Sequence, residues 1–164
     1  MNNNYVYHSK EISFCGYSGS GKTTLICSIL NRLNSKYRIG YIKSDAHNFQ
    51  MDKPGKDTFE AKSSGADTVF IQNKSEFAFI GNGPLPNGIV QTIFQNFDFV
   101  IVEGHKKIPL PKLLMIDDQK NINKLIENTN IEGILGFCGK EDFLRPNILE
   151  NFPVNLKSLP YFQR

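Results

Sequence analysis

A glycine-rich run at residues 16–24, G-Y-S-G-S-G-K-T-T, constrains this chain more than any other part of its sequence. It fits the pattern G-x-x-x-x-G-K-[ST], in which glycines let backbone N–H groups approach a phosphate and the next helix points its positive end at it. An apolar segment precedes the run and an amphipathic segment follows it, as in a strand–loop–helix unit. We therefore predict that the chain binds a nucleotide through its phosphates.

The motif predicts a role for each of its residues. Lys22 would reach the β- and γ-phosphates, and the Thr23 hydroxyl would bind Mg²⁺. A glycine-rich helix start with an ordinary surface lysine is the alternative, but it leaves both the Thr after the Lys and the preceding strand unexplained. The predicted nucleotide-binding residues are Gly16, Ser18, Gly19, Ser20, Gly21, Lys22, Thr23 and Thr24.

Apolar strands alternate with helical patterns along the chain. Strands are predicted at 12–16, 38–43, 99–102, 113–116 and 131–137, and helices at 22–35, 57–64, 89–97 and 122–127. This order predicts an α/β fold of the P-loop NTPase type, with a mostly parallel sheet and helices on both faces. A short polar link between 68–72 and 77–80 predicts an added antiparallel hairpin. The hairpin could extend the sheet edge, where a second subunit could pair.

Length and composition indicate a globular protein. The 164 residues predict one domain, with 1–10 and about 150–164 partly irregular. A net charge of +3 with scattered Lys and Arg does not indicate nucleic-acid binding. The Asn- and Tyr-rich segment 1–10 is not expected to act as a signal peptide, and no apolar run is long enough to predict a membrane span. Cys15, Cys27 and Cys138 form no C-x-x-C pair, and their apolar surroundings predict buried, reduced thiols in a cytoplasmic protein.

Ligands of open parallel sheets bind at the carboxyl ends of the strands. This rule separates acidic residues that could bind a ligand from those at the opposite ends of the strands. Glu103 directly follows an apolar strand, where it would hold Mg²⁺ or polarise a water. Asp45 closes another strand and would reach the same edge, although a turn-capping role is the alternative. Asp98 lies at the opposite strand end. We expect Thr23, Asp45 and Glu103 to hold the metal, and Glu103 and Lys22 to act in catalysis.

Other polar residues near these strand ends carry weaker signals. His47, His105 and Lys106 could contact phosphate or substrate, or could be solvated loop residues. The run G-K-E-D at 139–142 partly resembles the [NT]-K-x-D loop with which GTPases read guanine. On that pattern Asp142 would accept hydrogen bonds from the base, and a simple turn is the alternative.

Three stretches together resemble the MobB family, the adaptor proteins of molybdopterin-guanine dinucleotide biosynthesis. The first is the loop at 16–25. The second runs from K-S-D-A-H at 43–47 through M-D-K-P-G-K-D-T at 51–58 to S-G-A at 64–66, and the third is V-E-G-H-K at 102–106. The likeness covers residues 12–106. Lys62 stands where the family commonly has Arg, which loses a bidentate fork while keeping the charge.

The resemblance implies a GTP-binding homodimer with weak GTPase activity at most. Such a protein would use GTP and Mg²⁺ and assist a MobA-type nucleotidyltransferase, which joins GMP to molybdopterin. The polar loop 52–57 would then lie near the nucleotide or the acceptor. Two other classes stay open: a small-molecule P-loop kinase, for which the chain lacks clustered arginines, and a stand-alone GTPase, which needs a complete base-reading loop.

Overall fold

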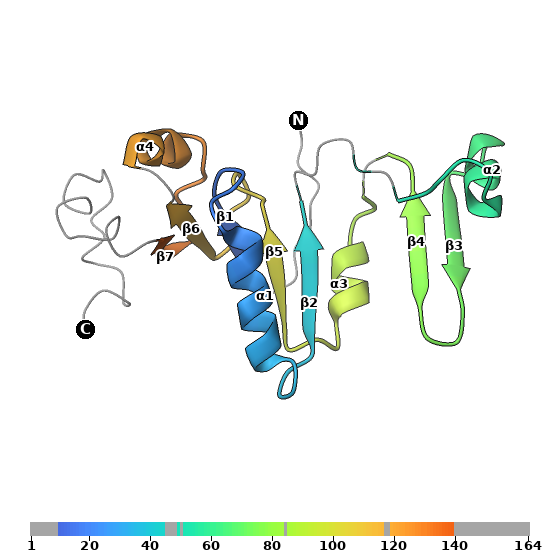
Figure 1. The fold of residues 1–164 in the computed structure, drawn as a ribbon, viewed down its shortest axis with the longest axis horizontal. Helices are drawn as coiled ribbons and strands as arrows, with labels where there is room; N and C mark the ends of the chain where they lie inside the picture. The colour runs from blue at the N-terminus through green and yellow to red at the C-terminus, as the bar shows by residue number, and fades with distance from the viewer. Residues whose placement is uncertain (1–9, 45–48, 50, 84, 117–118, 140–164) are drawn as a thin grey trace.

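The computed structural model describes residues 10–44, 49, 51–83, 85–116 and 119–139, with the side chains of 119–121 left out. Five parallel strands form the main sheet in the order β2-β5-β1-β6-β7 (Figure 1). The predicted mostly parallel α/β architecture is confirmed. The strands are β1 (Glu11–Cys15), β2 (Ile39–Lys43), β5 (Phe99–Glu103), β6 (Lys112–Ile116) and β7 (Ile134–Gly139).

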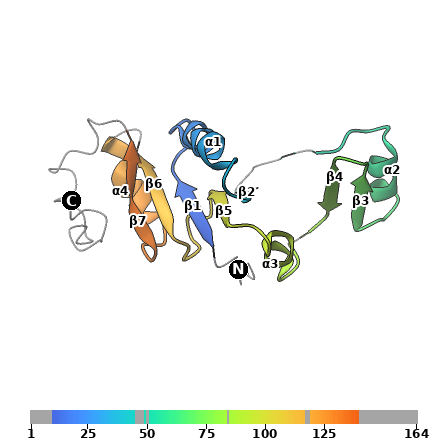
Figure 2. The same cartoon turned by 90° about the horizontal axis from the view of Figure 1, so that it is seen from below.

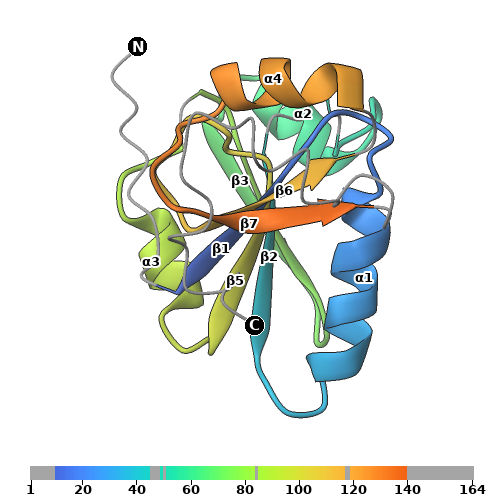
Figure 3. The ribbon, with the colours of Figure 1, turned by 90° about the vertical axis from the view of Figure 1, so that its left-hand side faces the viewer.

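Helices cover both faces of this sheet, because successive strand residues point to opposite sides. Phe14 and Ile101 pack with Ile26 of α1 on one face. Val100 packs with Phe94 of α3 on the other face, where α4 also covers β6 and β7. Figures 2 and 3 show α1 and α3 on opposite sides of the strands. The helices are α1 (Lys22–Leu33), α2 (Asp57–Ser63), α3 (Ile89–Phe94) and α4 (Gln119–Glu127).

The hairpin of β3 (Thr68–Gln72) and β4 (Phe77–Gly81) is antiparallel, as predicted. It forms a two-stranded sheet of its own, so the expectation that it extends the main sheet is wrong. Figures 1 and 2 show the hairpin and α2 apart from the five-stranded sheet.

The cysteines only partly match their prediction. All three are free thiols, and Cys15 is buried beneath the main sheet's helices. Cys27 is exposed, so its predicted burial is wrong. It follows Ile26 on α1, and consecutive helical residues point about 100° apart, which turns Cys27 away from the sheet. No helix in the described part of the chain is long and apolar enough to span a bilayer.

Lys112 is fully buried at the start of β6. Its Nζ donates to the carbonyl oxygens of Ile108 at 2.6 Å, Asn130 at 3.0 Å and Glu132 at 3.3 Å. Burial lowers the pKa of Lys112, and the three carbonyls offset the cost of removing its polar head from water. The side chain thereby joins the loop after β5 to the segment before β7.

Candidate functional site

The loop between β1 and α1 has the backbone geometry that an anion requires. A Cβ on Gly16 would lie 2.6 Å from Ser20 Oγ and 2.9 Å from Met115 Cβ, so only glycine fits there. Gly21 begins α1 with a left-handed φ of 84°, which glycine adopts without strain. No described side chain caps α1, and its first turn holds no acidic residue. Its first N–H groups are therefore suited to bind a phosphate.

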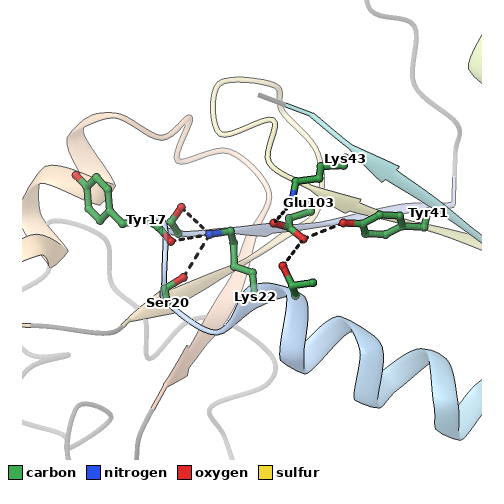
Figure 4. A network of polar contacts seen from close by, with 8 residues as sticks. Tyr17, Ser20, Lys22, Tyr41, Lys43 and Glu103 are labelled. Carbon is green, nitrogen blue, oxygen red and sulfur yellow. Dashed lines mark hydrogen bonds and ion pairs between the residues drawn. The ribbon is translucent and has the colours of Figure 1, made fainter. Parts of the chain in front are cut away.

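Lys22 lies against this loop. Its Nζ donates to the carbonyl oxygens of Tyr17 at 2.6 Å and Gly16 at 3.2 Å, and to Ser20 Oγ at 3.4 Å (Figure 4). These contacts hold the ammonium at the loop rather than in solvent. The positive charge of Lys22 and the N-terminal end of α1 thus belong to the same small region, which favours an anion.

The Glu103 carboxylate is the centre of a second cluster beside the loop. Its Oε2 accepts hydrogen bonds from Thr23 Oγ1 at 3.0 Å and from the Tyr41 hydroxyl at 2.9 Å. Its Oε1 lies 3.4 Å from Lys43 Nζ. Figure 4 shows Tyr41 and Lys43 of β2 reaching Glu103 of β5. The structure therefore brings together Thr23 and Glu103, which are 80 residues apart in sequence.

The three partners decide the ionisation of Glu103. Burial acts to raise the pKa of the carboxyl, but the hydrogen bonds from Tyr41 and Thr23 and the Lys43 ammonium outweigh it. The net pKa lies below its usual value, so Glu103 is ionised at neutral pH. Burial, the hydrogen bond to Glu103 and its negative charge raise the pKa of Tyr41 to about 12. Tyr41 is therefore a neutral donor to a charged acceptor.

Thr23 and Glu103 suit a magnesium ion that arrives with phosphate. Their hydroxyl and carboxylate oxygens lie 3.0 Å apart, and Mg²⁺ prefers hard oxygen ligands. Among the residues that the structure describes, no group of three or more His, Cys, Asp or Glu could form a metal site by itself. Mg²⁺ commonly takes one or two protein oxygens and completes its shell with water and substrate phosphates. The residues present fit that mode of binding.

The segment after Glu103 lies beside the loop. His105 has a positive φ of 57°, and its Nδ1 lies 3.3 Å from Ser44 Oγ. Lys106 Nζ lies 5.0 Å from the centroid of the Tyr17 ring, within the range of a cation–π contact. Lys106 therefore lies beside the predicted phosphate loop and His105 beside the residue that follows β2, in a segment joined to β6 by the buried Lys112.

The remaining candidate residues are either outside the described part of the chain or away from the loop. Asp45, His47 and Asp142 fall outside the described residues. Asp98 lies at the end of β5 away from Glu103, where its carboxylate accepts from the Arg38 N–H at 2.6 Å. Lys62 belongs to α2, which packs on the hairpin far from the loop in Figure 1.

A sequence model described as "Molybdopterin guanine dinucleotide synthesis protein B" matches residues 11–136. The chain belongs to the MobB family. This finding confirms the resemblance that the loop and the segments at 43–66 and 102–106 indicated.

Relatives of the MobB family cover most of this chain. An adapter protein of molybdopterin-guanine dinucleotide biosynthesis from Haemophilus influenzae is 37% identical over 110 residues, which are 63% of this chain and 61% of that protein. The Escherichia coli adapter protein is 28% identical over 114 residues, which are 65% of each chain. The matches therefore span just under two thirds of these relatives.

Solved MobB structures share the fold. The crystal structure of Bacillus subtilis MobB superposes with a TM-score of 0.61 at 22% identity, over 78% of this chain and 88% of that one. A MobB homolog from Bacillus stearothermophilus gives 0.57 at 20% identity, over 78% and 76%. At these identities the likeness is one of fold.

Tyr41 and Lys43 are the site residues that sequence reasoning missed in this MobB chain. They lie two residues apart on β2, so both point to the side that α1 covers. Glu103 lies at the end of the neighbouring strand, directly opposite Lys43 in the parallel register. The sequence did hold a signal for them, because residues two apart on a strand share a face. It placed a Tyr and a Lys on one face of β2, at the end of the strand next to Glu103.

Tyr41→Phe should lower the free energy of unfolding by about 1 kcal/mol, because it removes the donor to Glu103 Oε2. Urea denaturation at pH 7 measures this change. Tyr37→Phe is the control, since that ring packs against Phe99, and it should cost less than about 0.5 kcal/mol. Equal losses would contradict the role of the Tyr41 hydroxyl.

The raised pKa of Tyr41 predicts that the wild-type protein loses stability at high pH. The phenol ionises near pH 10 when unfolded but near pH 12 when folded, so ionisation favours the unfolded state between these values. The stability that Tyr41 contributes is therefore complete below pH 10 and falls as the pH rises toward 12. Tyr41→Phe should remove this part of the pH dependence.

Proposed function

We propose that the chain is a cytoplasmic adaptor that binds GTP with Mg²⁺ and assists a MobA-type nucleotidyltransferase in attaching GMP to molybdopterin. The observation that carries the nucleotide part is the contact of Thr23 Oγ1 with Glu103 Oε2 at 3.0 Å, next to the loop that holds Lys22. A phosphate tail would lie on the N-terminal end of α1, and the two oxygens would hold its metal ion.

Each loop residue has a place in this proposal. Gly16, Ser18, Gly19, Ser20 and Gly21 would supply the backbone that wraps the phosphates. Lys22 would carry the charge that binds them, with Thr23 and Thr24 in the first turn of the helix. Asp45 would add a metal ligand, and Asp142 would read the guanine base; both are proposed from sequence alone.

The chemistry of Glu103 supports weak hydrolysis at most. Its lowered pKa makes it a poor proton acceptor at neutral pH, and three donors already bind its oxygens. A general base works best when its pKa lies near the operating pH. Glu103 would therefore orient the metal and its waters, while the chain serves a partner enzyme rather than turning over GTP rapidly.

The adaptor role draws on the family. Haemophilus influenzae and Escherichia coli relatives are named adapter proteins of molybdopterin-guanine dinucleotide biosynthesis. In this proposal the chain works with the nucleotidyltransferase and molybdopterin of that synthesis. The free state of all three cysteines suits a reducing compartment such as the cytoplasm.

A competition titration tests the proposal. Purified protein with Mg²⁺ should bind labelled GTP, and unlabelled GTP should displace the label at lower concentration than ATP. Adding the protein to a MobA-type nucleotidyltransferase, GTP and molybdopterin should raise the yield of the guanine dinucleotide. No effect on that yield, together with phosphorylation of an added small-molecule acceptor, would favour a kinase instead.

The hairpin supports the proposal of a homodimer. Phe70, Phe77 and Phe79 lie on one face of the β3–β4 sheet and are 53%, 72% and 53% exposed. An isolated two-stranded sheet is marginally stable in water, and each of these strands pairs only with the other among the described strands. A second copy of the chain would cover this aromatic face.

Phe77→Ser should raise the dissociation constant of the homodimer about tenfold, because a partly covered aromatic ring contributes about 1.4 kcal/mol. Analytical ultracentrifugation over a concentration series measures the change. Ile131→Ser is the matched control, since Ile131 is 54% exposed in the turn before β7. Sedimentation of the wild type as a monomer at every concentration would refute the homodimer.

A further inference from the structure

Lys43 holds a position that the nucleotide-binding motif does not explain. It ends β2, next to Glu103 in the sheet register, and its Nζ lies 3.4 Å from Glu103 Oε1. Thr23 approaches the other oxygen of the same carboxylate. Lys43 is therefore a second cation at the candidate site, supplied by a different element from Lys22. Figure 4 shows Lys43 beside Glu103 and Lys22 against the loop oxygens.

The ion pair between Lys43 and Glu103 is of the kind that breaks easily. A distance of 3.4 Å is longer than that of a strong charge-assisted hydrogen bond. The Lys43 side chain is 53% exposed, whereas that of Glu103 is 9% exposed. The lysine end of the pair is thus in solvent on a long, flexible side chain, while Thr23 and Tyr41 also donate to the buried carboxylate. Lys43 can therefore exchange its anionic partner at small cost.

A bound magnesium nucleotide would supply the reason for such an exchange. Glu103 has a limited negative charge, and a divalent cation next to Thr23 would repel the nearby ammonium. The terminal phosphate of a triphosphate would bring a new anion to the same region, because Thr23 and Glu103 would hold the metal ion that accompanies the phosphate tail. A diphosphate has less charge and lacks that terminal group.

We propose that Lys43 is a specificity-determining residue that pairs with Glu103 in the absence of nucleotide and binds the terminal phosphate of a nucleoside triphosphate. This inference rests on the proposed nucleotide-binding function and adds the discrimination of triphosphate from diphosphate. Lys22 lies at the loop and serves both ligands. Lys43 serves only the ligand whose phosphate tail extends past the loop toward β2.

Isothermal titration of Lys43→Met with magnesium tests this division. The variant should bind GTP and inorganic tripolyphosphate about tenfold more weakly than the wild type, and should bind GDP and pyrophosphate within about twofold of it. Lys43→Arg, which keeps the charge, should restore most of the preference for the longer ligands. Lys36→Met, at an exposed position after α1, should change neither affinity.

The four probes separate the possible failures. Equal weakening of the long and short ligands, or no weakening, would overturn the role of Lys43. The guanine part of the proposed function is tested separately, with ATP as a fifth ligand. Wild-type binding of ATP as tight as that of GTP would contradict the guanine part, while weakening of the long ligands alone in Lys43→Met would still support the role of Lys43. A wild type that binds none of the four probes would overturn the nucleotide site and the Lys43 inference together.

Discussion

Replacing Lys22 with alanine should weaken GTP binding about 10- to 100-fold. The substitution removes a charged contact to phosphate, which contributes about 1.5–3 kcal/mol. Folding should change little, because Lys22 is only partly buried and donates to the loop oxygens of Gly16, Tyr17 and Ser20. Calorimetric titration with GTP and Mg²⁺ gives the affinity, and the urea midpoint checks the fold.

Lys36→Ala is the control for this measurement. Lys36 is exposed in the turn after α1, so its removal should leave GTP binding within about twofold of the wild type. If Lys22→Ala binds GTP as tightly as the wild type does, the loop is not the phosphate site. An equal loss in both variants would point to overall charge rather than to the loop.

Glu103→Gln should raise the magnesium concentration needed for half-maximal GTP binding about 10- to 100-fold. The amide has nearly the same shape but no negative charge, and hydrogen bonds to a charged group contribute about 1.5–3 kcal/mol. Binding of GTP at saturating magnesium should fall much less, because the loop and Lys22 are intact. Titrating magnesium against labelled GTP measures both quantities.

Glu127→Gln is the matched control, since Glu127 is exposed at the end of α4. It should leave the magnesium requirement unchanged. The Glu103 variant also loses the charge that Lys43 and Tyr41 share, so a urea denaturation should accompany the titration. A magnesium requirement equal to that of the wild type in a folded Glu103→Gln protein would remove Glu103 from the metal site.

Local signals account for the parts of the fold that were correctly predicted. Apolar runs and helical spacing depend on neighbouring residues, and they placed β1, α1 and β5 to within a few residues. The short link of the hairpin also predicted its antiparallel pairing. The detachment of the hairpin from the main sheet could not be predicted, because strand propensity does not say which edges pair.

The role of Lys112 shows a second limit. In the sequence Lys112 precedes the apolar run 113–116, a position that is typical of a solvated residue at the start of a strand. The structure buries it completely because its ammonium meets a carbonyl of the loop just before β6 and two carbonyls of the segment before β7. Cys27 shows the opposite error, since apolar neighbours along the helix did not reveal that its own direction is toward solvent.

The sequence by itself determined the glycine-rich loop between β1 and α1 and its lysine, because that motif is contiguous and its geometry follows from glycine and the start of a helix. The rule that ligands bind at the carboxyl ends of parallel strands also singled out Glu103 from the sequence. Only the tertiary structure decided that Tyr41 and Lys43 reach the same carboxylate, because the strand order β2-β5-β1 puts them beside it. Strand order depends on how helices pack over the whole sheet, and no local pattern encodes it.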